Sequence, residues 1–178
     1  MQLTPAQLAL LKTHLAANTN TIDGTAINAM PSDPDSNAAV AAWYNGLASA
    51  GDNQAFASPL LVWRPVVTIQ QMNSAIVWSA SPAGADAQAV MNSWLKWQSM
   101  TWANQIDMTD TQVRQGIDDV WGAGSQTATN LKATGTGRQA ATRAEMVFAG
   151  GGVNGARVTP VFGQQLDGDN VLAARNLP

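Results

Sequence analysis

The sequence has few of the side chains that carry out chemistry. Its 178 residues include no cysteine, one histidine (His14) and one glutamate (Glu145), and 12% are charged, against about 25% in an ordinary globular domain. Without cysteine there is no disulfide and no thiolate metal site, which fits a reducing compartment. This scarcity argues against an enzyme.

The chain also lacks runs of one charge and long apolar runs. Nine Lys and Arg residues are scattered among twelve Asp and Glu residues, for a net charge of -3, whereas affinity for DNA phosphates needs clustered cations. No apolar stretch is long enough for a membrane span. The start, Met-Gln-Leu-Thr-Pro, does not resemble a signal peptide. We therefore expect a protein made in a cytoplasm that has no membrane partner.

Apolar and aromatic residues, by contrast, are plentiful. The chain is 46% hydrophobic and has seven tryptophans, enough for a sizeable core. Apolar residues recur at helical spacing, and the capping patterns Thr4-x-x-Gln7 and Thr68-x-x-Gln71 indicate two helix starts. Ser36 is the expected cap of another helix, whose apolar face includes Leu47. Thr109 is the expected cap of the helix that stops at Gly122, and residues 18–35 are predicted to be loop. The predicted helices cover about 5–18, 36–50, 69–78, 83–103, 110–121, 126–133 and 138–149.

Two stretches are predicted to be extended. Residues 59–67 contain Pro65, which suits an edge strand or a connector, and residues 156–162 alternate imperfectly between apolar and polar. Val171 to Arg175 has the pattern of one helical turn. The predicted fold is therefore mainly α: a helical bundle over 1–150 with an extended β-like connector, and an extended C-terminal arm over 151–178.

Several groups have only part of the pattern of a chemical site. His14, late in a helix, is expected to be a surface histidine, and adjacent residues Asp118 and Asp119 diverge around a helix. Asp167-Gly-Asp-Asn begins like a calcium loop but lacks its later glycine and glutamate. The glycines of 135–137 and 150–152 lack the Lys-Ser/Thr of a phosphate loop. The sequence thus indicates no catalytic residue, metal site or cofactor.

The tryptophans divide into two groups. Trp43, Trp94, Trp97 and Trp121 lie on apolar faces and are predicted core residues. Those at segment ends can anchor a subunit interface, although core packing is favoured for each of them taken singly. Arg143 and Glu145 are two residues apart, cannot pair on one helix face, and are expected to reach other segments or subunits. The candidate interface residues are Trp63, Arg64, Trp78, Trp102, Arg143, Glu145, Val158, Val161 and Phe162.

Four motifs carry a resemblance. They are Ser58-Pro59 leading into Val62-Trp63-Arg64; Val113-Arg-Gln-Gly-Ile117 followed by Trp121; Ala141-Thr-Arg-Ala-Glu145 running into Phe148 and a glycine-rich loop; and Val171-Leu-Ala-Ala-Arg-Asn176. In this order they resemble a family of small proteins encoded among the structural genes of tailed bacteriophages, especially short-tailed ones. The sequence departs from that pattern in 18–57 and in the loop after Phe148.

The resemblance implies a virion component assembled in the host cytoplasm. Within the virion we favour a head-to-tail connector, or adaptor, that forms a ring between portal and tail and lines the DNA channel. Such adaptors are helical bundles whose extended arm docks on the portal. The expected partners are copies of itself in a homo-oligomeric ring, twelve-fold by analogy, the portal protein and tail proteins, with DNA only as passing cargo.

Two other functions compete with the connector. A tail terminator, tube or decoration protein would also be a virion component, and a tube protein should contain more strand. A small hydrolase carried by the particle would have to use aspartates and hydroxyl groups.

Overall fold

The computed structural model describes residues 3–53, 56, 59–80, 85–99, 104–148 and 165–178. The described chain is mainly helical, as predicted. It divides into two compact units, unit 1 (Met1–Val62 and Ala140–Pro178) and unit 2 (Trp63–Gln139). Unit 1 therefore takes residues from both sides of the domain boundary predicted at residue 150.

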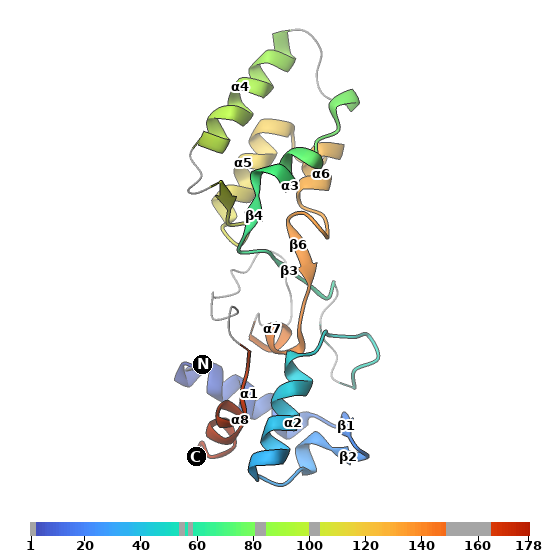
Figure 1. Cartoon of the computed structure of the whole chain (residues 1–178), viewed down its shortest axis with the longest axis vertical. Coiled ribbons are helices and arrows are strands. Elements are labelled where there is room, and N and C mark those ends of the chain that lie inside the picture. The colour runs from blue at the N-terminus through green and yellow to red at the C-terminus, as the bar shows by residue number, and fades with distance from the viewer. Residues whose placement is uncertain (1–2, 54–55, 57–58, 81–84, 100–103, 149–164) are drawn as a thin grey trace. The chain divides into compact units, whose positions relative to one another are not determined.

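Unit 1 is built around three helices far apart in sequence. α1 (Pro5–Ala17), α2 (Pro34–Asn45) and α8 (Gly168–Arg175) pack together, and α7 (Arg143–Phe148) contacts α1 and α2 (Figure 1). Their buried side chains form one apolar cluster, which includes Leu11, Leu15, Val40, Tyr44, Val171 and Ala174.

The segment between α1 and α2, predicted as loop, contains a small hairpin. β1 (Thr21–Ile22) and β2 (Thr25–Ala26) pair antiparallel and are followed by the 3₁₀ helix η1 (Ile27–Ala29). Asp23 and Gly24 connect the strands with φ values of 50° and 80°. Positive φ at both turn positions matches the right-handed twist of a two-residue hairpin, and Asp-Gly suits it.

The two ends of α2 differ from the prediction. The N-cap is Asp33, whose Oδ1 accepts from the Ser36 amide at 2.9 Å, so Ser36 lies inside the first turn. The helix ends at Asn45 because Gly46 has extended backbone, with ψ 158°. Leu47, predicted on the buried face, is consequently 61% exposed.

The C-terminal helix is confirmed, and it is longer than the predicted turn. α8 begins after Asp167, whose side chain caps it by accepting from the Asn170 amide. Val171 and Ala174 are fully buried against α1 and α2, so these residues belong to the core of unit 1. Half of the predicted arm, residues 151–164 with Val158, Val161 and Phe162, lies outside the described residues.

Unit 2 contains the remaining helices. They are α3 (Ile69–Ser74), the 3₁₀ helix η2 (Trp78–Ala80), α4 (Ala85–Ser99), α5 (Thr111–Trp121) and α6 (Gln126–Leu131). β4 (Val67–Thr68) pairs antiparallel with β5 (Gln105–Ile106). The extended stretch predicted around Pro65 is thus two short strands, β3 (Leu61–Trp63) and β4, and β3 pairs with β6 (Arg138–Ala140).

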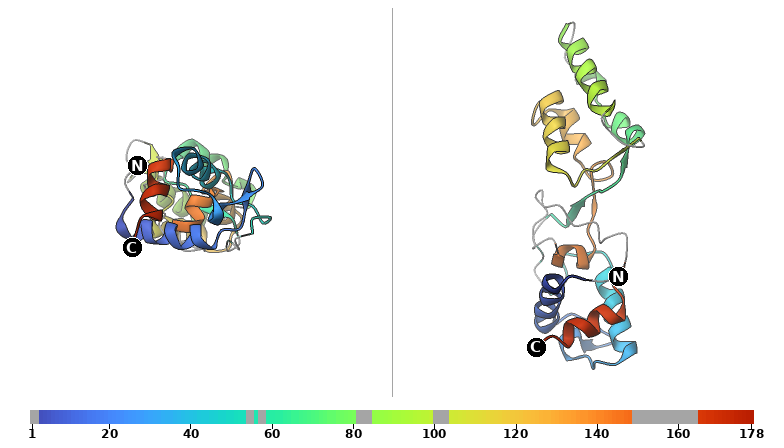
Figure 2. Two further views of the ribbon diagram at one scale, coloured as in Figure 1. Left: turned by 90° about the horizontal axis from the view of Figure 1, so that it is seen from below. Right: turned by 90° about the vertical axis from the view of Figure 1, so that its left-hand side faces the viewer.

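Tryptophans fill the centre of unit 2. Trp94 and Trp97 of α4 stack with ring centroids 4.8 Å apart, and Trp121 of α5 meets Trp94 edge-on at 5.6 Å. Trp94 and Trp97 are buried as predicted, whereas Trp121 is only partly buried at the edge of the cluster. α4 and α5 lie side by side (Figure 2).

The start of α5 is set by a different residue from the one expected. Asp110 is the N-cap and accepts from the Gln112 amide at 2.8 Å. Thr109, the expected cap, is buried and donates its hydroxyl to Asp107. The helix ends where predicted, at Gly122 with φ 83°. In the part of the chain that the structure describes, no helix is long and apolar enough to cross a membrane.

Gly116 permits the close contact between α4 and α5, and its replacement by alanine tests that contact. A Cβ at this position would lie 2.6 Å from Trp97 Nε1. The clash should outweigh the helix preference of alanine, about 1 kcal/mol, because Trp97 is stacked and buried. We expect Gly116→Ala to lower the free energy of unfolding by about 1–2 kcal/mol in urea denaturation followed by tryptophan fluorescence.

Gly51→Ala is the matched control, since its Cβ would meet only Ser49 Oγ, at 3.6 Å. It should change stability by less than about 0.5 kcal/mol. Equal stability of the Gly116 variant and the wild type would contradict the close-contact explanation.

Candidate functional site

Arg143 joins three segments of unit 1. Its Nε and Nη2 each donate to a carboxylate oxygen of Asp52 at 2.9 Å, and its Nη1 donates to Trp43 O at 3.1 Å. The guanidinium also lies over the Trp43 ring, 4.3 Å from the centroid. Both charged side chains are largely buried. This bidentate pairing is a strong hydrogen-bonding geometry between an arginine and a carboxylate.

The position of the Arg143 guanidinium also accounts for the glycine at position 46. A Cβ at Gly46 would lie 2.7 Å from Arg143 Nη1 and 3.2 Å from Trp43 O. The Arg143 amide in turn donates to Gly46 O at 2.9 Å. The end of α2 is therefore shaped to accept the guanidinium, and Arg143 reaches another segment, as predicted.

Glu145 has a local role, so the expectation that it reaches another segment is wrong. Its carboxylate accepts from the Thr142 amide at 2.7 Å, and the Thr142 hydroxyl accepts from the Glu145 amide at 3.2 Å. This is a reciprocal capping box. It starts α7 at Arg143, and the first part of the predicted helix over 138–149 is instead β6.

Trp63 is buried in unit 2 and contacts two arginines. Arg114 Cζ lies 4.7 Å and Arg138 Cζ 4.0 Å from the centroid of its ring. Arg114 is itself buried and donates to Met108 O at 2.6 Å and Thr109 O at 2.9 Å. With 4% of its surface exposed, Trp63 is a core residue of unit 2, which is the reading favoured for it singly over its candidate place at an interface.

Burial dominates the electrostatics of these two arginines. It lowers the pKa of both Arg114 and Arg138, and in Arg114 the carboxylates of Asp110 and Asp107 act in the opposite direction. Trp63 Nε1 and Arg138 Nε are buried, and neither has a hydrogen-bond partner among the described residues. Stacking on the indole therefore accounts for the position of Arg138.

The remaining expected interface residues have varied surroundings. Arg64 Nη1 donates to Gly135 O and Thr136 O, both at 3.2 Å, so its side chain holds the loop before β6. Gly137 in that loop is buried, and a Cβ there would lie 2.6 Å from Leu131 O, so the position needs glycine for packing. Trp78 is 56% exposed. Trp102 lies outside the described residues.

His14 is not a simple surface residue. Its Nδ1 lies 2.8 Å from the hydroxyl of the fully buried Tyr44, which also accepts from Asn18 Nδ2 at 3.1 Å. The His14 ring stacks on Phe56 with centroids 5.5 Å apart. In the neutral tautomer that carries its proton on Nε2, His14 accepts the Tyr44 hydroxyl at Nδ1. Burial lowers the pKa of His14 and raises that of Tyr44 to about 12.

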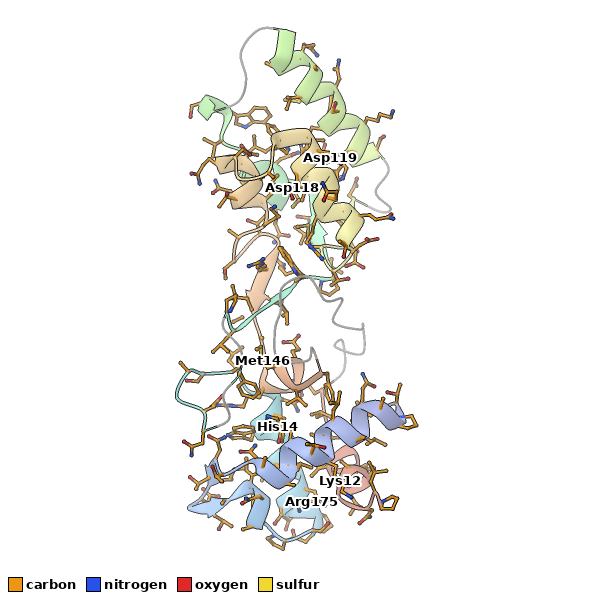
Figure 3. All side chains as sticks on the ribbon, turned by 180° about the vertical axis from the view of Figure 1, so that it is seen from behind. Lys12, His14, Asp118, Asp119, Met146 and Arg175 are labelled. Atoms are coloured by element: carbon orange, nitrogen blue, oxygen red, sulfur yellow. The ribbon has the colours of Figure 1, made fainter. Side chains whose placement is uncertain are left out.

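The carboxylates do not come together as a site. Asp118 and Asp119 lie on α5 (Figure 3), where Asp118 pairs with Lys132 and Asp119 accepts from Gln115. Asp167 caps α8. Among the described residues, no three His, Asp or Glu side chains are grouped as metal ligands.

Two helix faces are exposed and nearly uncharged. We call them the α1 face, in unit 1, and the α4 face, in unit 2. Leu10 on the α1 face is 47% exposed and Leu95 on the α4 face is 54% exposed. The exposed residues are Pro5, Ala6, Ala9, Leu10, Thr13, Ala16 and Ala17 on α1, and Gln88, Ala89, Asn92, Ser93, Leu95, Lys96 and Ser99 on α4.

Comparison with protein-family models, with curated proteins and with solved structures finds no match to this chain.

Replacing Arg143 by lysine tests the ion pair in unit 1. Lysine keeps the charge but loses the two-pronged bond and the stacking on Trp43. We expect Arg143→Lys to lower the free energy of unfolding by about 2–3 kcal/mol, measured by urea denaturation. Lys132→Ala, which breaks the more exposed pair with Asp118, is the control and should cost less than about 1 kcal/mol. Similar losses in both variants would contradict a special role for Arg143.

Stability should fall when the pH is lowered from 7 to 5.5. The folded-state pKa of His14 lies below its ordinary 6.5, so between those two values the unfolded chain binds more protons than the folded one. The stabilisation is complete above about 6.5 and decreases as the pH falls towards the folded pKa. In the tautomer with its proton on Nε2, protonation of His14 also removes the acceptor for the Tyr44 hydroxyl.

Urea denaturation at several pH values should therefore show this slope in the wild type and lose most of it in His14→Gln. The test is clean because the chain has one histidine. A variant that keeps the full slope would show that other groups cause it.

Proposed function

We propose that the chain is a structural subunit of a tailed-bacteriophage virion and, within the virion, a head-to-tail connector that forms a ring between portal and tail. The observation that carries the proposal is a contrast between interior and surface. The charged side chains of Arg143 and Arg114 are buried and form their hydrogen bonds inside the two units. By contrast, nearly all the exposed side chains of the α1 and α4 faces are uncharged.

Such faces suit contact with other proteins. Leu10 and Leu95 are large apolar side chains exposed to solvent on these faces, and Trp78 is exposed elsewhere in unit 2. Protein interfaces have an apolar core and are richer in tryptophan than the rest of the surface. Each unit presents a different face. Contact between unlike faces of identical subunits is heterologous, and it closes into a ring when the rotation between subunits permits.

The motifs that carry the family resemblance have structural roles here, which supports the proposal. Trp63 and Arg114 come from two motifs and contact each other. Arg143 and Glu145, from a third motif, fix α7 to α2 and cap it. A sequence family that keeps these residues would keep the packing of both units.

The charge distribution suits a subunit that DNA passes without being held. Unit 2 has five aspartates and five Lys or Arg residues, and the net charge of -3 comes from unit 1. A surface that gripped DNA would need clustered cations. The bundle arrangement and the C-terminal arm that would dock on the portal remain part of the proposal.

The exposed leucine of the α4 face offers a direct test of assembly. We expect the wild type to form a closed ring in size-exclusion chromatography with light scattering, and Leu95→Glu to shift it to monomers while its circular dichroism stays unchanged. The control Gln70→Glu adds the same charge at an exposed position of α3 and should assemble normally.

The location of the chain in the phage particle distinguishes a connector from a terminator, tube or decoration protein. Cryo-electron microscopy of purified particles should place the chain between portal and tail. Density at the tail end, along the tube or on the capsid surface would instead identify a terminator, tube or decoration protein. A wild type that stays monomeric and is absent from particles would overturn the virion proposal.

A further inference from the structure

Unit 1 contains a pocket between the starts of two helices. It has a volume of about 260 Å³ and lies where the first turn of α2 meets the first turn of α8. The helices approach closely there, because a Cβ at Gly168 would lie 3.3 Å from the Ala38 amide nitrogen. The other lining residues are Ser32, Pro34, Asn37, Asp167, Asp169 and Leu172.

One wall of the pocket contains a buried oxygen that lacks a partner. Asn37 is 2% exposed, and its Oδ1 has no hydrogen-bond partner among the described residues. Leaving a buried acceptor unsatisfied is costly, so such a group calls for an explanation. The last side-chain torsion of asparagine is soft, and rotation about it would bring this oxygen to the pocket. A hydrogen-bond donor bound there would then satisfy it.

The charge of the pocket comes from Asp169. Two other carboxylates at the helix starts are already engaged. Asp167 caps α8 and has a charged partner of its own, and Asp33 caps α2 and interacts with Arg175. As caps, they also offset the positive ends of the two helices. Among the described residues, by contrast, the Asp169 side chain forms no hydrogen bond and no ion pair. Its negative charge is therefore available to a ligand.

The lining determines the kind of ligand. The Asp169 carboxylate, Asn37 Oδ1 and the Ser32 hydroxyl can all accept hydrogen bonds. A primary ammonium group has three N–H donors and no acceptor, so it matches such a set. Pro34 and Leu172 are apolar and favour a hydrocarbon group. At about 30 Å³ for each water-sized group, the volume accommodates roughly nine non-hydrogen atoms, which a bare inorganic cation would not fill.

We propose that this pocket binds a primary ammonium group carried on an apolar stem. The ammonium would donate to Asp169, Asn37 and Ser32, and the stem would lie against Pro34 and Leu172. The same chemistry is offered by a free alkylamine and by a lysine side chain of another protein. The inference does not depend on the virion assignment.

The first test compares three probes on the wild-type chain. Butylammonium has charge and stem, butanol has the stem without the charge, and the ammonium ion has the charge without the stem. We expect butylammonium to give saturable shifts in ¹⁵N–¹H spectra at the amides of Ser32, Asn37, Gly168, Asp169 and Leu172. Butanol and ammonium should bind at least about tenfold more weakly, since each lacks one half of the recognition.

Two variants test the acceptors separately. Asp169→Asn removes the charge at an exposed position and keeps the shape of the side chain, and Asn37→Ala removes the unpartnered oxygen. Each should weaken butylammonium binding about tenfold. The matched control Asp119→Asn removes a carboxylate from α5 in unit 2 and should leave binding unchanged. If Asn37→Ala fails to fold, Asp169→Asn and the three-probe comparison still decide the proposal.

The outcomes are distinct. Equal binding of ammonium and butylammonium would show a bare anionic site, and equal binding of butanol would show a purely apolar hollow. Either result, unchanged binding in Asp169→Asn, or shifts that neither saturate nor gather at the pocket overturns the proposal. When butylammonium binds as expected, an end-blocked peptide with one lysine identifies the source. Tighter binding of the peptide indicates a protein partner, and weaker binding indicates a small amine.

Discussion

The buried ion pair between Arg143 and Asp52 is the interaction on which unit 1 depends. One guanidinium binds a carboxylate, the last turn of α2 through Trp43 O, and the face of the Trp43 ring. Burying two charges is costly unless their geometry is good and their remaining hydrogen bonds are made. Here both conditions hold, and a glycine at position 46 leaves the space that the guanidinium needs.

Unit 2 also contains arginines that stabilise its interior, and their partners include an aromatic ring. Arg114 and Arg138 contact one indole, and Arg114 also binds the backbone before its own helix. In a chain with 12% charged residues, these arginines hold turns and strands in place. These strong charges are thus structural, whereas the exposed α1 and α4 faces are nearly uncharged. That contrast supports the proposed role as an assembling subunit.

Short residue patterns predicted the secondary structure correctly where one such pattern fixes the start or the end of a helix. The capping boxes at Thr4 and Thr68 and the stop at Gly122 are all found in the structure. The same rules could have found two features that were missed. Thr142-x-x-Glu145 is a third capping box, which explains the start of α7, and Asp23-Gly24 is a hairpin turn.

The sequence by itself determined the helical class, most helix positions and the scarcity of reactive groups, because spacing and composition act over a few residues. Only the tertiary structure decided that Trp63 is buried between arginines, that His14 binds Tyr44, and that Asn37 and Asp169 line one pocket. Those facts join residues from 30 to more than 130 positions apart. No local pattern encodes such contacts, since they arise only when distant helices pack.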